Sequence, residues 1–391
     1  MITDHVHPAV MEIPESFCIE SNIGMFPMSA GQNRNLYDCM ANGFALFATI
    51  KPSGRYKVRV APTGHEGLKQ YSFKGRAVTF DALLRQIAEE LDSLYWDDVV
   101  ASYEKDARYF QSKHGKLAYY CYNEHIDSIP VIFLHGGPGD SSSITRPRSM
   151  HLMHPVYAFD QLGCGLSDPI PDMSKWNHED YFRELKEFID GMEFKKVILI
   201  GASWGAGLAL GYAEEYGCDK IECMVLPSPF VSAKKWEEDQ MANLRTMPEE
   251  YVRDMTEILE GEWDAAKYRR VMSEYYSRFL FNRSCNREIA VAAGEQEQND
   301  VFKAMWGKND FRCTGAMKDL DLIPGMEKID VPVLLMCGDR DEVTLDTMLE
   351  YQKLIKGSRL SIVPYAGHAL SGEQPEVYTA SVKAFLRELG H

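Results

Sequence analysis

Residues 197–205 read Val-Ile-Leu-Ile-Gly-Ala-Ser-Trp-Gly, and this stretch decides the fold. The four apolar residues at its start predict a short strand that is buried on both faces. The next five fit the pattern G-x-S-x-G, and a helix is expected from Trp204 to about Tyr216. A serine on a sharp strand-to-helix turn exposes its hydroxyl at the top of the sheet. Ser203 is therefore the candidate nucleophile; the alternative is a serine that only caps the helix.

The same alternation of apolar strands and helices extends on both sides of this motif. Strands are expected at residues 117–122, 131–134, 156–159, 197–200, 221–226, 331–336 and 360–363. Helices are expected at residues 181–192, 204–216, 345–355 and 375–389. Continuous apolar strands separated by helices are typical of a mostly parallel sheet with helices on both faces. The sequence therefore predicts an α/β fold of that kind.

One long segment interrupts the alternation. Residues 230–316 have a helical pattern and are rich in aromatic and charged side chains. An insertion into an open α/β sheet is expected to cover the carboxyl ends of the strands, where such sheets bind ligands. The sequence thus predicts a first core segment at 106–229, a helical cap at 230–316 and a second core segment at 317–391.

The first 105 residues have a different pattern and carry no catalytic motif. Residues 1–36 are expected to be irregular. The elements expected after them are a β-hairpin of residues 44–50 and 56–61 with its turn at 52–54, a helix from Thr79 to about Leu94, and a second helical segment to about Tyr109. We therefore predict an accessory α+β unit at 1–105, which supplies no chemistry but could restrict access or build an oligomer.

Composition and charge exclude several classes of protein. Of the 391 residues, 45% are hydrophobic and 26% charged, values of a folded globular chain rather than a disordered one. The net charge of −16 argues against non-specific binding to nucleic acid or anionic membranes. The nine cysteines show no metal-binding or redox spacing, which suggests a reducing compartment. With no signal peptide recognised at the N-terminus, we expect a cytoplasmic protein.

A serine nucleophile needs a base and an acid that orients the base, and both are expected late in the chain. Of the eleven histidines, only His368 and His391 lie beyond Asp341. His368 comes just after a predicted strand, and Asp341 just after the preceding one. Asp341 would hold the imidazole tautomer and stabilise its cation. Asp339 is the rival acid, and a plain surface histidine is the alternative for His368.

A glycine-rich loop after the strand at 131–134 is the candidate oxyanion site. Residues 135–139 read His-Gly-Gly-Pro-Gly. In serine hydrolases of this topology one oxyanion-hole N–H comes from this loop and the other from the residue after the nucleophile. We therefore assign the two donors to Gly137 and Trp204. A phosphate-binding loop is the alternative, but no G-K-S/T follows. His135 is expected to be structural.

No metal site is expected. His151 with His154, and His5 with His7, are close enough in sequence to suggest metal ligands. Neither pair is accompanied by carboxylates or cysteines in a metal-binding pattern. The sequence therefore predicts no metal and no other cofactor.

Taken together, the motifs resemble a known family. The segments that carry the resemblance are HGGPG at 135–139, DQLGCGLS at 160–167, GASWG at 201–205, WGKNDF at 306–311 and DEVT at 341–344. They resemble the proline iminopeptidase (prolyl aminopeptidase) branch of the α/β-hydrolases, and in particular tricorn-associated aminopeptidases and related amino-acid amidases. The resemblance covers about 106–391. It implies an α/β-hydrolase fold with an inserted cap, and it does not extend to the N-terminal unit.

The resemblance also implies an activity and a substrate site. It implies a triad of Ser203, Asp341 and His368, and acidic residues that hold the substrate's free α-ammonium, here Glu342 and Asp310. Asp310 stands where the family has the longer Glu, which puts its reach in question. The expected activity is a serine aminopeptidase or amidase that acts on short peptides or aminoacyl amides, with a proline preference inherited from the family. The alternatives are an esterase or lactonase for uncharged acyl substrates, and a ligand-binding receptor with a vestigial triad.

Overall fold

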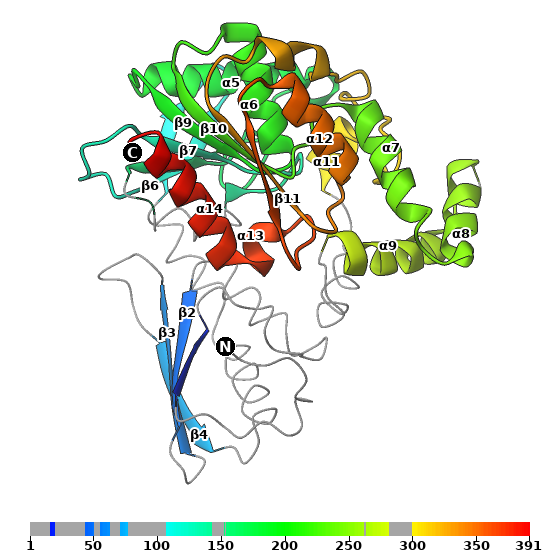
Figure 1. The fold of residues 1–391 in the computed structure, drawn as a ribbon, viewed down its shortest axis with the longest axis horizontal. Coiled ribbons are helices and arrows are strands. Elements are labelled where there is room, and N and C mark those ends of the chain that lie inside the picture. Colours follow the sequence, from blue (N-terminus) through cyan, green and yellow to red (C-terminus); the bar gives the residue numbers. More distant parts are fainter. Residues whose placement is uncertain are drawn as a thin grey trace.

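A computed structural model describes residues 16–19, 44–50, 55–62, 71–76, 107–142, 152, 154–261, 263–280 and 299–391. Its centre is an eight-stranded sheet with the strand order β12-β11-β10-β9-β7-β8-β6-β5 (Figure 1). The strands are β5 (Arg108–Gln111), β6 (Lys116–Tyr122), β7 (Val131–Leu134), β8 (Val156–Phe159), β9 (Val197–Gly201), β10 (Ile221–Pro227), β11 (Val333–Gly338) and β12 (Arg359–Val363).

Most of this sheet is parallel, as predicted. The six neighbouring strands β8-β7-β9-β10-β11-β12, given in their order across the sheet, pair in parallel. At one edge, β6 runs antiparallel to both β8 and β5. All residues of β7, β8, β9 and β11 are buried. Buried strands without polar alternation are expected where helices cover both faces of a sheet. The prediction from the apolar runs is therefore confirmed.

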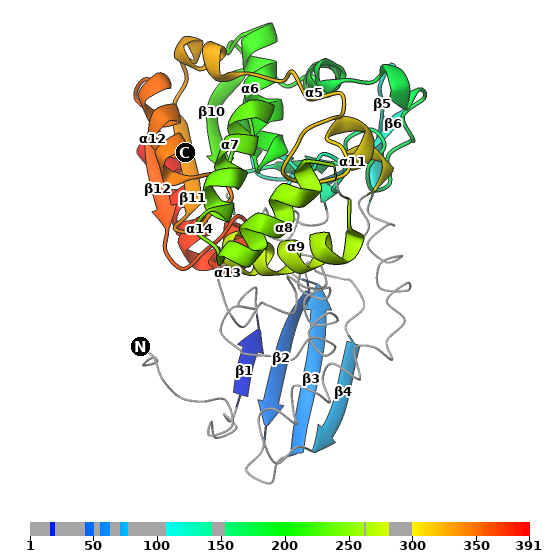
Figure 2. The same cartoon turned by 90° about the vertical axis from the view of Figure 1, so that its right-hand side faces the viewer.

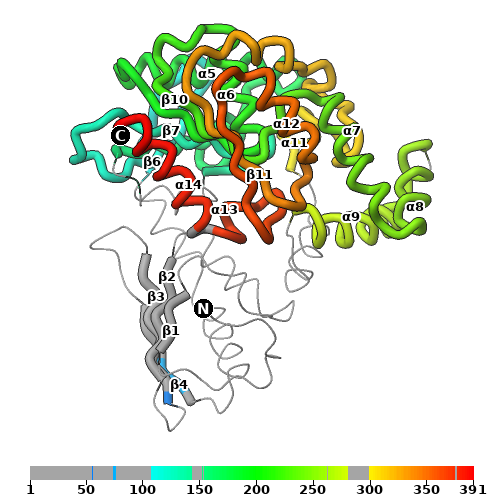
Figure 3. The backbone as a smooth tube through the Cα atoms, in the orientation of Figure 1, coloured from blue at the N-terminus to red at the C-terminus, as the bar shows by residue number. Residues whose placement is uncertain are grey.

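Helices cover the two faces through separate apolar cores. The core helices are α5 (His178–Gly191), α6 (Trp204–Tyr216), α12 (Leu345–Leu354) and α14 (Pro375–Glu388). Three short helical elements also occur in the core segments: η4 (Met173–Lys175), η6 (Ile323–Lys328) and α13 (Leu370–Glu373). Leu199 of β9 packs in the core shared with α5, α6 and α12, whereas Ile198 packs in the core shared with α14. Successive side chains of a strand point to opposite faces. One strand thus contributes to both cores, and the backbone path to α14 can be followed in Figure 3.

Helix α6 shows why the sequence needs glycine beside the sheet. Its residues from Trp204 to Ala213 are all buried, so it is covered on every side. A Cβ at Gly211 would lie 2.1 Å from the Phe182 ring of α5. Glycine therefore allows α5 and α6 to pack closely.

The inserted segment is mostly helical up to Met305 in its described residues, and 306–316 is irregular. Its helices are α7 (Ala233–Leu244), α8 (Glu249–Leu259), α9 (Ala265–Phe279) and α11 (Asp300–Met305) (Figure 2). Ser232 and Asp264 accept hydrogen bonds from N–H groups of the first turns of α7 and α9, which stabilises both helix starts. Met255, Tyr275 and Phe311 belong to an apolar core of this segment. The segment therefore has packing of its own.

A second, separate sheet lies in the first hundred residues. It contains β1 (Ser16–Ile19), β2 (Phe44–Ile50), β3 (Arg55–Pro62) and β4 (Tyr71–Arg76), paired antiparallel in chain order. The predicted strands at 44–50 and 56–61 are confirmed. The prediction that 1–36 is irregular is wrong at β1, which pairs with β2 over four residues.

Other predictions for this region are corrected or not covered. The second helical segment, predicted to reach Tyr109, is wrong at its end, because Tyr109 lies in β5 and pairs with Ala118. The turn at 52–54 and the helix predicted from Thr79 lie outside the described residues. The role of 1–105 as an accessory unit stays a prediction. Within the described part of the chain, no helix has the length and apolar character that a membrane span requires.

Candidate active site

Ser203 lies on a strained turn between β9 and α6. Its φ is 54° and its ψ is −119°, a left-handed region that non-glycine residues rarely adopt. A Cβ at Gly201 would lie 2.1 Å from the Gly205 carbonyl oxygen, and a Cβ at Gly205 would lie 2.2 Å from that of Leu134. Both glycines of the motif are therefore required by the close approach of backbone.

Backbone hydrogen bonds hold the turn in place. The Ser203 N–H donates to the Pro227 carbonyl at 3.0 Å, and the Phe230 N–H donates to the Ser203 carbonyl at 3.1 Å. The Ser203 side chain makes no capping hydrogen bond with α6. Ser203 therefore does not cap α6 through its side chain. It lines a cavity instead.

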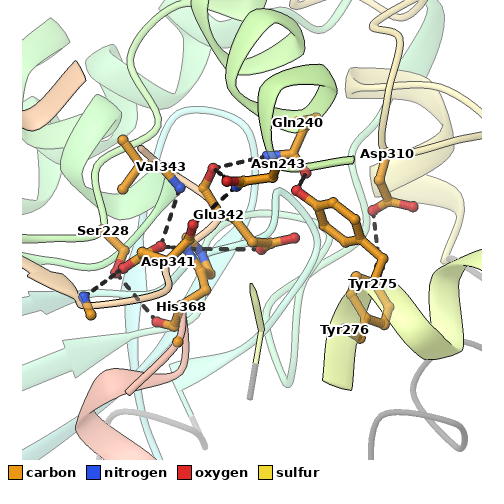
Figure 4. Close-up of polar contacts among 12 residues, drawn as sticks. Ser228, Gln240, Asn243, Tyr275, Tyr276, Asp310, Asp341, Glu342, Val343 and His368 are labelled. Atoms are coloured by element: carbon orange, nitrogen blue, oxygen red, sulfur yellow. Dashed lines mark hydrogen bonds and ion pairs between the residues drawn. The ribbon is translucent and has the colours of Figure 1, made fainter. Parts of the chain in front are cut away.

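Asp341, and not Asp339, contacts His368. The Nδ1 of His368 lies 2.8 Å from Oδ1 of Asp341 (Figure 4). Asp341 is buried at 4% exposure, and its carboxylate also accepts hydrogen bonds from the Ser228 hydroxyl at 2.6 Å and the Gly338 N–H at 3.0 Å. Asp339 instead accepts from the Ala366 N–H at 3.2 Å. Of the two candidate acids, only Asp341 is placed to orient the imidazole.

The surroundings of His368 favour its charged form. Burial alone would lower the pKa of His368, but the charge and hydrogen bond of Asp341 and the charges of Glu342 and Asp140 raise this pKa to about 9. A protonated imidazole cannot accept a proton from Ser203. The fraction of protein with a free base therefore grows as the pH rises toward 9.

This pKa predicts the pH dependence of nucleophile activation. The rate at which an uncharged phosphonate modifies Ser203 should rise with pH through a midpoint near 9, well above the ordinary histidine value of about 6.5. Glu342→Gln removes one of the charges that raise the pKa and should move the midpoint to lower pH. Inactivation rates measured from pH 5 to 10 test both statements. A midpoint near 6.5 in the native protein would contradict the first.

The loop at 135–139 lies directly against the nucleophile turn. A Cβ at Gly136 would lie 3.2 Å from Cβ of Ser203. Gly137 has a φ of +100° and precedes a cis peptide bond to Pro138. Among the described residues, the N–H groups of Gly137 and Trp204 donate to no backbone carbonyl. The predicted oxyanion role requires N–H groups that are not engaged in this way.

His135 has a structural position. Its Nε2 accepts from the Gln161 N–H at 3.0 Å, and its Nδ1 lies 3.0 Å from the Gly136 carbonyl. Burial lowers the pKa of His135, so the ring is neutral and protonated on Nδ1. The Gln161 side chain in turn accepts from the Trp204 indole at 2.9 Å. This chain of contacts fixes the glycine loop relative to the nucleophile turn.

The two predicted amine-binding acids reach the same region from different elements. Glu342 lies between β11 and α12 and is 7% exposed, with Oε2 3.8 Å from Nδ1 of His368. Asp310 lies after α11, where Tyr276 donates to Oδ1 at 3.1 Å and Tyr268 donates to Oδ2. In Figure 4 the Glu342 carboxylate is directed toward the side on which Asp310 lies.

The electrostatics of Glu342 suit a cationic ligand. Burial raises the pKa of Glu342, the positive charge of His368 opposes this, and the charges of Asp310 and Asp341 add to it, so that the pKa lies at about 7. Within the described ranges, no Lys or Arg forms an ion pair with Glu342. The cation beside it is the His368 imidazolium at 3.8 Å, and a buried carboxylate is costly once His368 becomes the neutral base. A bound cation would offset that cost.

One cavity of about 350 Å³ brings most of the predicted site residues together. It is lined by Gly137, Pro138, Asp140, Ser203, Phe230, Trp236, Tyr276, Leu280, Asn299, Phe302, Trp306, Asp310, Glu342 and His368. Two predicted site residues do not line the cavity. Trp204 is fully buried, and Asp341 contacts His368, which does line the cavity. No hydrogen bond joins Ser203 to His368 in the described structure; such bonds often tighten only when substrate is bound. Within the same ranges, no three His, Cys, Asp or Glu side chains are gathered as a metal site requires.

Several residues of the site carried no signal in the sequence. Ser228 reaches Asp341 from the end of β10, and Asn243 of α7 donates to the carbonyls of Asp341 and Glu342 at 3.0 and 2.9 Å. Tyr268 holds Asp310 from α9. The sequence separations involved are large, so no local pattern could reveal these contacts. Asp140 was adjacent to the HGGPG motif and could have been found there.

Comparison with known proteins agrees with this geometry. The family model described as alpha/beta hydrolase fold matches residues 129–375, more than half of the chain, and the chain belongs to that family. The proline iminopeptidase of Heyndrickxia coagulans is 29% identical over 278 residues, which cover 70% of this chain and 96% of the relative. That of Saccharolobus solfataricus is 28% identical over 267 residues, covering 66% of this chain and 85% of the relative.

A solved structure shares the fold. The proline iminopeptidase of Mycobacterium smegmatis matches with a TM-score of 0.64 and 22% identity, covering 72% of this chain and 98% of that chain. The resemblance to the proline iminopeptidase branch is thereby confirmed, and the chain is a hydrolase similar to those enzymes. Each match leaves more than a quarter of this chain uncovered.

Proposed function

We propose that this protein is a serine aminopeptidase that releases the N-terminal residue from short peptides or aminoacyl amides. The observation that carries the proposal is the buried Glu342 carboxylate, which lines the same cavity as Ser203 and His368. An uncharged acyl substrate would leave that carboxylate with His368, 3.8 Å away, as its one nearby cation among the described residues, whereas a free α-ammonium would pair with it directly. The relatives named proline iminopeptidase make proline the first residue to test.

In the proposed reaction Ser203 is acylated by the first residue of the substrate. Its Oγ attacks the carbonyl carbon of the first peptide bond while Nε2 of His368 takes the hydroxyl proton. The N–H groups of Gly137 and Trp204 would bind the oxyanion that forms. When the C–N bond breaks, His368 returns the proton to the leaving amine. Water then attacks the acyl ester in the same way, which releases the amino acid and restores Ser203.

The acids limit the reaction to the first peptide bond. Glu342 and Asp310 would hold the α-ammonium by charge-assisted hydrogen bonds. Fixing the amine fixes the position of the first carbonyl carbon relative to Ser203, and more distant peptide bonds do not reach the nucleophile. The Asn243 contacts to the Glu342 backbone support this placement from the cap.

A panel of chromogenic aminoacyl amides and short acyl esters tests the proposal. We expect turnover of the free aminoacyl amides, with prolyl and small apolar first residues included, and loss of that turnover in Ser203→Ala. Turnover of esters alone would favour an esterase or lactonase. Binding of the amides without any turnover would favour a receptor with a vestigial triad.

A further inference from the structure

The carboxylates of the adjacent residues Asp341 and Glu342 are held in different ways. That of Asp341 accepts hydrogen bonds at 2.6 to 3.2 Å from Ser228, Gly338, Val343 and His368. The Glu342 carboxylate accepts no hydrogen bond from the residues that the structure describes, and its ion-pair contact is with Nδ1 of His368 at 3.8 Å. The placement of Glu342 therefore depends on how its backbone is held.

Two side-chain amides of α7 hold that backbone. Nδ2 of Asn243 donates to the Asp341 carbonyl at 3.0 Å and to the Glu342 carbonyl at 2.9 Å. Nε2 of Gln240, one turn earlier on the same face of the helix, donates to the Glu342 carbonyl at 3.4 Å. Both amides are buried, so the loss of either hydrogen bond would leave polar groups unsatisfied. The loop that carries both acids is thus tied to the cap.

Helix α9 orients these amides from behind. The Tyr275 hydroxyl donates to Oε1 of Gln240 at 2.6 Å (Figure 4). Because an amide carries its acceptor and its donors on different atoms, this contact directs Nε2 of Gln240 toward the Glu342 carbonyl. Tyr275 is fully buried and packs on the Phe311 ring. Tyr275, Gln240 and Asn243 therefore form an amide relay from α9 to the acid loop.

The same helix holds the second predicted amine-binding acid. Tyr268 and Tyr276 of α9 donate to the two carboxylate oxygens of Asp310. Besides burial, the negative charge of Asp310 raises the pKa of Glu342, because the two carboxylates repel each other. Two acids that repel must both be held if they are to face one cation. Helix α9 contacts one of them directly and the other through the amide relay.

We propose that the amide relay is a positioning device that fixes Glu342 beside Asp310, so that both acids bind one α-ammonium. This inference rests on the proposed aminopeptidase function. The relay determines selectivity for a free amine and not the reactivity of Ser203, because the Asp341 carboxylate keeps its four contacts without it. The three members of the relay lie outside the cavity lining, so they are positioning residues and not catalytic ones.

Kinetics on a free aminoacyl amide and its N-acetylated twin test the relay, with each protein measured at its plateau pH. Asn243→Ala should lower kcat/KM for the free amide at least about tenfold, mainly through KM, and change that of the acetylated twin by less than about twofold. Tyr275→Phe removes one hydroxyl and should act in the same direction to a smaller extent. In a Gln240→Leu background Tyr275→Phe should add nothing. An additive effect would show a different route and would overturn the relay.

The pH profile of Ser203 labelling by an uncharged phosphonate is a second readout that needs no peptide hydrolysis. Against the effect of burial, the pKa of His368 is raised by the charges of Asp341, Glu342 and Asp140. Since Asp341 already occupies Nδ1 of His368, nearly every displacement of Glu342 lengthens its 3.8 Å separation from that atom. Asn243→Ala should therefore move the labelling midpoint to lower pH, as Glu342→Gln does, with the plateau rate within about twofold of the native one.

Tyr181→Phe is the matched control for the hydroxyl variant. Tyr181 of α5 is also fully buried, and its hydroxyl donates to the Leu162 carbonyl at 3.2 Å. The control loses a comparable hydrogen bond away from the acid loop and should change neither the ratio of the two amides nor the labelling midpoint. If Asn243→Ala does not fold, the same two measurements on Tyr275→Phe decide.

The outcomes separate the relay from the proposed function. An unchanged amide ratio or an unchanged midpoint in folded Asn243→Ala would overturn the relay. So would a large fall in its plateau labelling rate, since Asn243 would then support the triad. If the native protein does not distinguish the two amides, the proposed function fails, whereas a lower midpoint in Asn243→Ala would still show that the relay positions Glu342.

Discussion

Replacing Ser203 by alanine is expected to reduce kcat on an aminoacyl amide by about 10⁴-fold or more, as loss of the nucleophile does in other triads. The variant should remain folded, because the turn is held by backbone hydrogen bonds: the Ser203 N–H donates to the Pro227 carbonyl, and the Phe230 N–H donates to the Ser203 carbonyl. The side-chain hydroxyl makes no capping contact whose loss would unfold α6. Steady-state kinetics, with circular dichroism to establish folding, provide the measurement. A serine-directed phosphonate should add mass to Ser203 and to no other serine.

Ser232→Ala is a suitable control for this experiment. Ser232 is also buried, and it caps α7 through a hydrogen bond from the Lys235 N–H. Loss of the cap should lower the free energy of unfolding by about 1 kcal/mol but leave phosphonate labelling intact. Retained amidase activity in a folded Ser203→Ala protein would remove Ser203 from the role of nucleophile.

The central sheet could be predicted because its strands are buried on both faces. Runs such as Val131–Leu134 and Val197–Gly201 are apolar without interruption, and short apolar runs between helices have few other interpretations. The edge strand β5 was missed because Arg108–Gln111 is mostly exposed and has no such run. Its pairing with β6 depends on tertiary contacts rather than on its own pattern. The four residues of β1 are too few to carry a periodic signal.

The site was predictable in part because one motif determines where its partners must lie. Ser203 on a strand-to-helix turn requires an acid and a histidine after later strands, and few residues satisfy that order. The preference for Asp341 over Asp339 had its strongest support in the family resemblance, since both residues lie within three positions of the end of β11. The structure distinguishes the two acids by the direction of their side chains, because the carboxylate of Asp341 contacts His368. Ser228 and Tyr268 escaped prediction because fold geometry alone brings them to the acids.

Acetylation of the substrate's α-amine is expected to lower kcat/KM at least about 100-fold, roughly 2.7 kcal/mol of transition-state stabilisation. The acetylated amide has the same leaving group but no positive charge to pair with Glu342. In a cavity where burial raises the pKa of Glu342 to about 7, the lost contact includes a charge-assisted hydrogen bond and leaves a carboxylate unpaired. Glu342→Gln should lose activity on the free-amine substrate and remain nearly unchanged on the acetylated one.

The comparison must separate substrate binding from the effect of Glu342 on the base. Because Glu342 also raises the pKa of His368, each protein is measured at the pH where its own rate has reached a plateau. Glu327→Gln, at an exposed acid of η6, is the matched control and should behave as the native protein does. If both substrates react equally fast with the native protein, the α-ammonium plays no part in binding. Glu342 would then not be an amine-binding residue, and an esterase would explain the cavity better than an aminopeptidase.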